Sequence, residues 1–230
     1  MKKDTYSLLK NYMISCMGDS AHDREHIYRV LYVALEIAQT EKDVDYDVLI
    51  SASLLHDIGR KEQFENPNLC HAQVGAVKAY DFLMSHGFSE EYAGHVKECI
   101  AAHRYRSNAA PESIEAKILF DADKIDVTGA TGIARTLIYK GRVSEPLYCV
   151  LPDGQISDGA NDEQPSFFHE YKYKLENLYS HFYTEKGREI ACKRRAAASA
   201  FYDSILEEVC ASRNSGLNYL EECIDKESLQ

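Results

Sequence analysis

Apolar residues recur every three or four positions along most of this chain, which is the period of an amphipathic helix. One such stripe passes through His26, Val30, Val33 and Ile37. No segment alternates clearly enough to indicate a β-strand, apart from a short candidate at Leu147–Leu151. The pattern therefore predicts an all-α fold.

Capping and breaking residues set the expected helix ends. Asp45 and Ser89 each precede a stripe, where a side-chain oxygen can accept a bond from a free backbone N–H, and Gly87 follows another stripe. The expected helices run from Ser20 to Ile37, Asp45 to Gly59, His71 to His86, Ser89 to His103, Pro111 to Asp126, Gly132 to Lys140, Phe167 to Tyr183 and Glu185 to Cys210.

These elements predict one domain over residues 1–212, followed by a peripheral tail at 213–230. A helical-bundle core covers residues 20–140. A stretch rich in Gly, Pro, Asp and Ser at 151–166 is expected to be a loop, and a C-terminal helical extension covers 167–212. A chain of 230 residues, of which 45% are hydrophobic, is long enough to bury one core of this kind.

Charge and composition narrow the possible partners. A formal net charge of -11 argues against binding to a nucleic-acid duplex or a membrane, since both favour a basic surface. No apolar run reaches membrane-spanning length, and the N-terminus lacks the apolar segment of a signal peptide. Seven cysteines without a CxxC pair favour reduced thiols and a cytoplasmic protein. A phosphorylated small molecule stays possible, because a bound cation would reverse the local field.

The pair His56-Asp57 is the most informative chemical feature, because it closes the apolar run of residues 48–55. An imidazole and a carboxylate at the end of a buried helix are costly to desolvate unless a partner compensates them. A divalent metal ion accepts nitrogen and oxygen ligands together. His26 and Asp123 each lie on the apolar stripe of another helix, so the pattern predicts that all four side chains meet at one ion.

The sequence around these residues resembles the H…HD…D signature of the HD-domain superfamily of metal-dependent phosphohydrolases. The matching strings are HDREHIYRV at 22–30, LLHDIG at 54–59 and DADKID at 121–126. Two further strings, GATGIART at 129–136 and FYTEKGREIA at 182–191, resemble a bacterial subgroup of small HD hydrolases. The resemblance covers residues 20–140 strongly and 165–210 less closely.

This resemblance implies an HD-domain helical bundle that hydrolyses phosphate esters or anhydrides. Carried over residue by residue, it makes His26, His56, Asp57 and Asp123 the ligands of one metal ion. His22, one turn before His26, is an alternative ligand, although a supporting or surface role is favoured for it.

The number of ions is left open by the sequence. HAQVGA at 71–76 and IAAHR at 100–104 resemble the strings that hold a second ion in binuclear HD enzymes. On that reading His71 and His103 are further metal ligands, and Asp57 bridges the two ions. The alternative is that the two histidines contact substrate phosphate beside a single ion. His95 is a weak candidate for one more ligand.

Basic residues near these strings are candidates for substrate binding. Arg60 is placed to hold a phosphate in a bidentate grip, and Lys61, Arg104 and Lys124 are weaker candidates for the same role. Asp126 lies one turn beyond Asp123, where it would either handle a proton of the attacking water or hydrogen-bond a ligand histidine. We therefore predict Asp57, Arg60 and Asp126 as the catalytic residues.

The resulting hypothesis is a metal-dependent phosphohydrolase that cleaves a phosphorylated small molecule, with a nucleotide monoester or triphosphate favoured. One alternative is a binuclear phosphodiesterase or dinucleoside polyphosphate hydrolase. Another is a non-catalytic helical module that keeps a metal and binds a nucleotide or a partner. The mixed ligands suit Mn, Fe, Co, Ni or Zn better than Ca, and Mg is possible. Either a monomer or a homodimer is compatible with the sequence.

Overall fold

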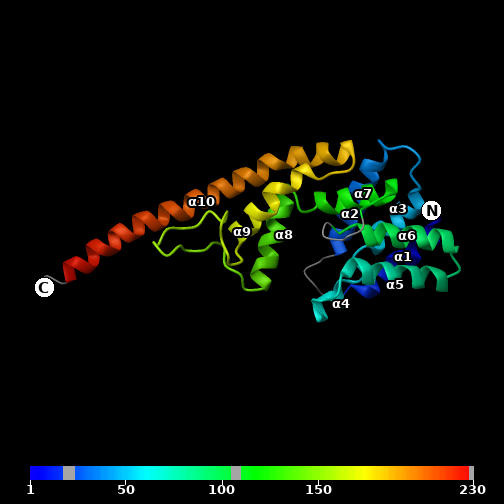
Figure 1. Cartoon of the computed structure of the whole chain (residues 1–230), viewed down its shortest axis with the longest axis horizontal. Helices are drawn as coiled ribbons and strands as arrows, with labels where there is room; N and C mark the ends of the chain where they lie inside the picture. Colours follow the sequence, from blue (N-terminus) through cyan, green and yellow to red (C-terminus); the bar gives the residue numbers. More distant parts are fainter. Residues whose placement is uncertain (18–23, 105–109, 228–230) are drawn as a thin grey trace. The chain divides into compact units, whose positions relative to one another are not determined.

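The computed structural model describes residues 1–17, 24–104 and 110–227, and these ranges contain helices but no strand (Figure 1). The helices are α1 (Lys3–Cys16), α2 (Arg24–Ala38), α3 (Tyr46–Leu55), α4 (Arg60–Glu65), α5 (His71–Ser85), α6 (Glu90–Ala102), α7 (Ile114–Ile125), α8 (Gly129–Arg142), α9 (Phe167–Tyr173), the 3-10 helix η1 (Leu175–Ser180) and α10 (Glu185–Glu227). The all-α prediction is confirmed. Where a short strand was expected, an isolated antiparallel bridge joins Val150 to Ile156.

The chain forms two compact units. Unit 1 comprises residues 1–126 and 181–191, and unit 2 comprises residues 127–180 and 192–230. Each unit buries apolar side chains of its own, and α10 contributes residues to both. No helix in the described ranges has both the length and the apolar character needed to cross a membrane.

Unit 1 is a helical bundle in which α3 is the central element. Helix α3 packs against α1, α2, α6 and α7, and α2 also packs against α7. Its buried residues include Leu49, Leu54 and Leu55, so this helix has apolar neighbours on most sides. The next residues are His56 and Asp57, which the chain therefore places at the end of a largely buried helix.

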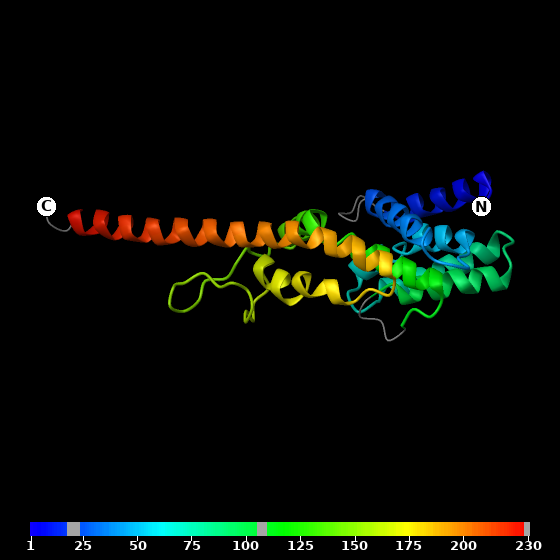
Figure 2. The same cartoon turned by 90° about the horizontal axis from the view of Figure 1, so that it is seen from above.

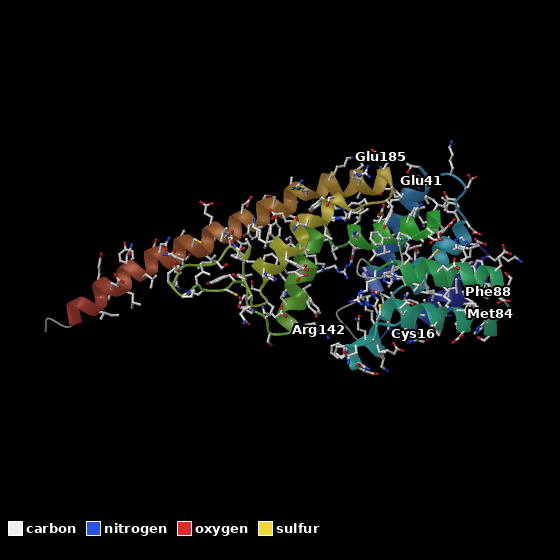
Figure 3. All side chains as sticks on the ribbon, in the orientation of Figure 1. Cys16, Glu41, Met84, Phe88, Arg142 and Glu185 are labelled. Carbon is white, nitrogen blue, oxygen red and sulfur yellow. The ribbon has the colours of Figure 1, made fainter. Side chains whose placement is uncertain are left out.

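Helices α5 and α6 form an antiparallel hairpin within this bundle. The labels of Met84 and Phe88 mark the turn that joins them (Figure 3). His71 opens α5 and His103 follows the last residue of α6. Both histidines consequently lie at the end of the hairpin opposite its turn.

The predicted caps explain several helix starts. The Asp45 side chain accepts bonds from the backbone N–H groups of Asp47 and Val48 at the start of α3, and Ser89 caps α6 by accepting from Tyr92. The start expected at Pro111 is wrong, because Ser113 is the capping residue and α7 begins at Ile114. The helix start expected at Ser20 lies outside the described residues.

Three other boundaries differ from the expectation. The single helix expected over 167–183 is two elements, α9 and η1, since Lys174 departs from helical geometry. Helix α8 is longer than predicted at both ends. Helix α10 continues to Glu227, well past the extension boundary expected at residue 212 (Figure 2).

Unit 2 is held by an aromatic core. Phe167 and Phe168 are fully buried, and Tyr171 stacks on Tyr202 of α10 with ring centroids 4.1 Å apart. The Tyr202 hydroxyl donates a hydrogen bond to the backbone carbonyl of Asp158, in the predicted loop. Aromatic stacking and this bond join the loop, α9 and α10 into one unit.

Candidate metal centre

The predicted ligand residues all lie at or near helix ends in unit 1. The structure places His26 in the first turn of α2, His56 and Asp57 directly after α3, His71 at the start of α5, His103 directly after α6 and Asp123 in the last turn of α7. Five are buried, and the Asp123 side chain is 24% exposed. Enclosed histidines and carboxylates with one partly open acidic residue are suited to an ion that a solute can reach.

A close backbone approach brings the His56-Asp57 turn to the start of α5. A Cβ atom added to Gly59 would lie 2.4 Å from the carbonyl oxygen of His71 and 2.6 Å from the nitrogen of Gly75. Only glycine fits at that separation. Gly59 therefore allows residues from two helices that are distant in sequence to lie side by side.

The first set of ligand atoms surrounds Nε2 of His26. This nitrogen lies 3.3 Å from Nε2 of His56, 3.4 Å from Oδ2 of Asp57 and 3.4 Å from Oδ1 of Asp123. Ligands bound at about 2.1 Å to a tetrahedral zinc-like ion are separated by about 3.4 Å. The four side chains thus have the spacing of a metal coordination shell.

The second set shares Asp57 but uses its other oxygen. Oδ1 of Asp57 lies 3.5 Å from Nε2 of His71 and 3.7 Å from Nε2 of His103. The two histidine nitrogens are 3.3 Å apart. Asp57 is therefore positioned to bridge two cations. Besides Asp57, three ligand residues lie on one side and two on the other among the described residues.

Hydrogen bonds on the far side of each ring orient the imidazoles. Nδ1 of His56 donates to the carbonyl of Ser53 at 2.8 Å, and Nδ1 of His103 donates to the carbonyl of Ile100 at 2.6 Å. Nδ1 of His71 lies 2.7 Å from Oε1 of Gln63. A carbonyl only accepts, so these rings carry their proton on Nδ1 and turn the Nε2 lone pair toward the centre.

Facing lone pairs need a cation. The Nε2 atoms of His71 and His103 both lack hydrogen, so they cannot bond to each other at 3.3 Å. The buried Oδ2 of Asp57 has no hydrogen-bond partner in the described part of the chain. Such groups are costly to bury unless a positive charge joins them. The donor set and this orphaned oxygen fit a divalent ion.

The local electrostatics keep the ligands in their metal-binding protonation states. Burial lowers the pKa of His56 to about 4 and that of His71 to about 2, so both rings are neutral. Burial alone would raise the pKa of the Asp57 carboxyl, but the Arg60 guanidinium brings it well below its usual value. Neutral imidazoles and ionised carboxylates are the forms that bind metal.

Asp126 supports His26. Its Oδ2 lies 2.8 Å from Nδ1 of His26, and Nε of Arg29 donates to its Oδ1 at 2.7 Å. Nη2 of Arg29 also donates to Oδ2, at 3.1 Å. Of the two roles predicted for Asp126, this geometry favours bonding to the ligand histidine. Arg29 was missed by the sequence analysis, although it lies one turn after His26 on the same helix.

The predicted phosphate-binding residues are placed differently from one another. Nε of Arg60 donates to Oδ1 of Asp57 at 2.8 Å, directly beside the ligand sets. The Lys61 side chain is 66% exposed, and its amine lies 4.0 Å from a carboxylate oxygen of Glu65. Of these two neighbours, only Arg60 contacts a predicted metal ligand within the described ranges.

The other two predicted phosphate-binding residues, Arg104 and Lys124, contact groups that are not predicted ligands. Nη1 of Arg104 donates to the sulfur of Cys70 at 3.4 Å. Nζ of Lys124 donates to the carbonyl of His181 at 2.9 Å and lies 4.2 Å from the ring centroid of Phe120. Burial lowers the pKa of Lys124 to about 8.

The weaker candidate His95 does not join the ligand atoms. Nε2 of His95 lies 3.1 Å from Oε2 of Glu115, so this ring pairs with a carboxylate of α7. The weak prediction that His95 is a ligand is therefore not supported by its position. His22 lies outside the described residues.

An all-α bundle in which histidines and aspartates from separate helices meet around one aspartate defines a metal-binding helical hydrolase of the HD type. The HD-domain family model matches residues 24–128, and the chain belongs to the HD-domain superfamily. Membership makes it a metal-dependent hydrolase in general.

Relatives share the fold over most of the chain. The chain is 32% identical to the Bacillus subtilis protein YpgQ over 192 residues, which is 81% of this chain and 84% of YpgQ. A crystal structure of YpgQ in complex with ADP aligns with a TM-score of 0.67 and 26% identity, covering 88% of this chain and 96% of YpgQ. A protein from an uncultured Thermotogales bacterium, described as a predicted HD superfamily hydrolase, aligns with a TM-score of 0.59 and 30% identity, covering 87% and 90% of the two chains.

Proposed function

We propose that this chain is a metal-dependent phosphohydrolase that cleaves a phosphorylated small molecule, and that the substrate is a nucleotide. The observation that carries the proposal is the meeting of His26, His56, Asp57 and Asp123 at ligand spacing in an HD-type fold. The ADP complex of the relative YpgQ supports the nucleotide as the substrate class.

The first ligand set would hold one divalent ion, and its mixed nitrogen and oxygen atoms suit Mn, Fe, Co, Ni or Zn, with Mg also possible. When bound, such an ion polarises a phosphoryl oxygen and lowers the pKa of water. His71 and His103 are proposed either to hold a second ion with Asp57 or to contact the substrate phosphate.

Arg60 is the proposed phosphate-binding residue. Its Nε donates a hydrogen bond to Asp57, whereas its Nη groups make no hydrogen bond to other described residues. Those donors are available to grip a phosphate oxygen and to stabilise the charge that develops during cleavage. Arg104 and Lys124 lie next in sequence to predicted ligands and are proposed as weaker contributors.

Asp57 and Asp126 have separate proposed tasks. Asp57 fixes the cation from a buried position between the two histidine pairs. Asp126 holds the Nδ1 proton of His26 and thereby keeps the Nε2 lone pair directed at the ion. Because His26 and Arg29 both bond to its carboxylate, a role as proton acceptor for water is the less favoured of the two.

One specific observation favours a second candidate function. The shared position of Asp57, with ligand atoms on both of its oxygens, is suited to a binuclear phosphodiesterase or dinucleoside polyphosphate hydrolase. The third candidate is a non-catalytic metal-containing module. On this hypothesis the protein binds a nucleotide or a partner without turnover.

The test is a panel of phosphorylated substrates with metal-reconstituted protein. Nucleoside monophosphates, nucleoside triphosphates, a dinucleoside tetraphosphate and a phosphodiester would each be incubated with added Mn²⁺. The products (nucleosides, nucleotides, phosphate and pyrophosphate) would be separated by chromatography and quantified. We expect turnover of at least one nucleotide, and a loss of at least a thousandfold in Asp57→Ala with native helicity retained. Absence of turnover across the panel, with metal bound, would identify the non-catalytic module.

A further inference from the structure

We propose that the Arg60 guanidinium acts as a built-in competitor for the second ion, so that the folded protein holds one divalent ion tightly and a second one weakly. The inference rests on the proposed metal centre, but not on the identity of the substrate. It concerns how many ions Asp57 can bridge.

The geometry places Arg60 on the oxygen that the second ion needs. Nε of Arg60 donates to Oδ1 of Asp57 at 2.8 Å, and the same oxygen faces His71 and His103 at 3.5 and 3.7 Å. Oδ2, on the side of His26 and His56, has no such donor. Arg60 therefore contacts one side of the bridging carboxylate and not the other.

The local backbone holds Arg60 in this place. The N–H of Arg60 donates to the carbonyl of Asp57 at 3.0 Å, in the turn that joins α3 to α4. Because the two residues are three apart in one turn, the ion pair forms without any long-range closure. The guanidinium is thus a fixed positive charge of unit 1.

Charge makes this arrangement unfavourable for a second divalent ion. A cation bound to Oδ1 at about 2.2 Å would lie within about 5 Å of Nε of Arg60, where two positive charges repel each other strongly in a buried site. Besides the shared Asp57, the second set offers two ligands, His71 and His103, where the first offers three, His26, His56 and Asp123, among the described residues. Both features weaken the second site more than the first.

The experiment is a Mn²⁺ titration of the metal-free full-length protein, followed by electron paramagnetic resonance of free and bound ion. For the unaltered protein we expect one tight ion and a second at least tenfold weaker. In Arg60→Gln the second dissociation constant should fall at least tenfold, with a spin-coupled signal from two ions that share a carboxylate. The dissociation constant of the first, tightly bound Mn²⁺ ion should change less than threefold.

The matched control is Lys61→Gln, which removes the same charge from the neighbouring, exposed residue and should leave both constants within twofold. The double variant Arg60→Gln/His71→Gln lacks a ligand of the second ion, so it should no longer bind a second Mn²⁺ ion tightly. Arg60→Met serves as a second neutral variant if Arg60→Gln lacks native helicity.

Two tight spin-coupled ions in the unaltered protein would overturn the proposal. So would a dissociation constant of the second ion that is unchanged in the neutral variants. These readouts require no turnover, so failure of the phosphohydrolase assignment would be seen separately in the substrate panel.

Discussion

Each imidazole at the centre depends on an acceptor that is not itself a ligand. His56 and His103 use backbone carbonyls one turn back in their own segments, so their orientation follows from the local helix end. His71 depends on the side chain of Gln63, and His26 on that of Asp126. Only His26 has a charged acceptor, and a carboxylate strengthens the ring as a ligand more than an amide does.

We therefore expect Asp126→Ala to weaken binding of the first Mn²⁺ ion by about 10- to 100-fold, because His26 loses its orienting acceptor. Asp126→Asn keeps an oxygen at that position and should cost less. Titration calorimetry of the metal-free protein measures the effect. Equal affinity in Asp126→Ala and the unaltered protein would show that packing alone orients His26.

At this scale the sequence indicates the candidate ligands, whereas it does not indicate the residues that support them. His26 and Asp123 lie on apolar stripes, and their burial or partial burial in unit 1 follows from that pattern. Gln63 is in a short helix without buried residues, so no pattern marks it as a partner of His71. A lone histidine such as His95 carries no sign of whether its partner is a metal or a carboxylate.

At the scale of elements, the turn between α3 and α4 brings the ligand-bearing segments together. Gly59→Ala would place a methyl carbon 2.4 Å from the carbonyl oxygen of His71, and backbone atoms cannot move aside as a flexible side chain can. We expect a loss of about 1–3 kcal/mol in the free energy of unfolding, measured in urea, and weaker metal binding as His71 shifts.

Gly94→Ala is the matched control for this substitution. Gly94 lies inside α6, and a Cβ there would meet nothing within 4 Å. The variant should be stabilised by up to about 1 kcal/mol through helix propensity alone, with metal affinity unchanged. Two variants equally destabilised would mean that the close approach at Gly59 has no special role.

Another element depends on Asp121, whose buried carboxylate binds the segment that leads into α10. It accepts bonds from the N–H groups of Tyr183 and Thr184, at 2.9 and 2.7 Å, and from the Thr184 hydroxyl at 2.7 Å. Asp121→Ala would leave these donors buried without acceptors, at a cost of about 1–3 kcal/mol for each unsatisfied group. Urea denaturation should show a loss of at least about 2 kcal/mol, and a smaller loss for Asp121→Asn. A change below about 0.5 kcal/mol would mean that water replaces the carboxylate.

Helix prediction succeeded where an apolar stripe and a cap coincide, as at Asp45 and Ser89. It missed α1, because only Leu9 and Met13 of that polar segment are fully buried. It also missed α4, which buries no residue and has no stripe to detect. The end of α10 was predicted wrongly too, since residues 213–230 were taken as a peripheral tail, whereas the helix continues to Glu227.

At the scale of the whole molecule, a metal ion would add a further link between elements that apolar contacts and the hydrogen bonds to Asp126 already join. The first ligand set draws on α2, on the residues after α3 and on α7, all within unit 1. The aromatic core of unit 2 contains none of these ligand residues. Metal binding should therefore stabilise the two units unequally.

Hydrogen exchange measured by mass spectrometry checks this expectation. At a free Mn²⁺ concentration 100 times the dissociation constant, binding contributes about 2.7 kcal/mol to states in which the site is intact. Peptides from α2, α3 and α7 should gain protection up to about this limit, while peptides from α9 should change little. His56→Gln removes a ligand and should abolish the gain. If α9 were protected as strongly as α3, the two units would unfold as one, and the separate core around Phe167 and Phe168 would not be an independent source of stability.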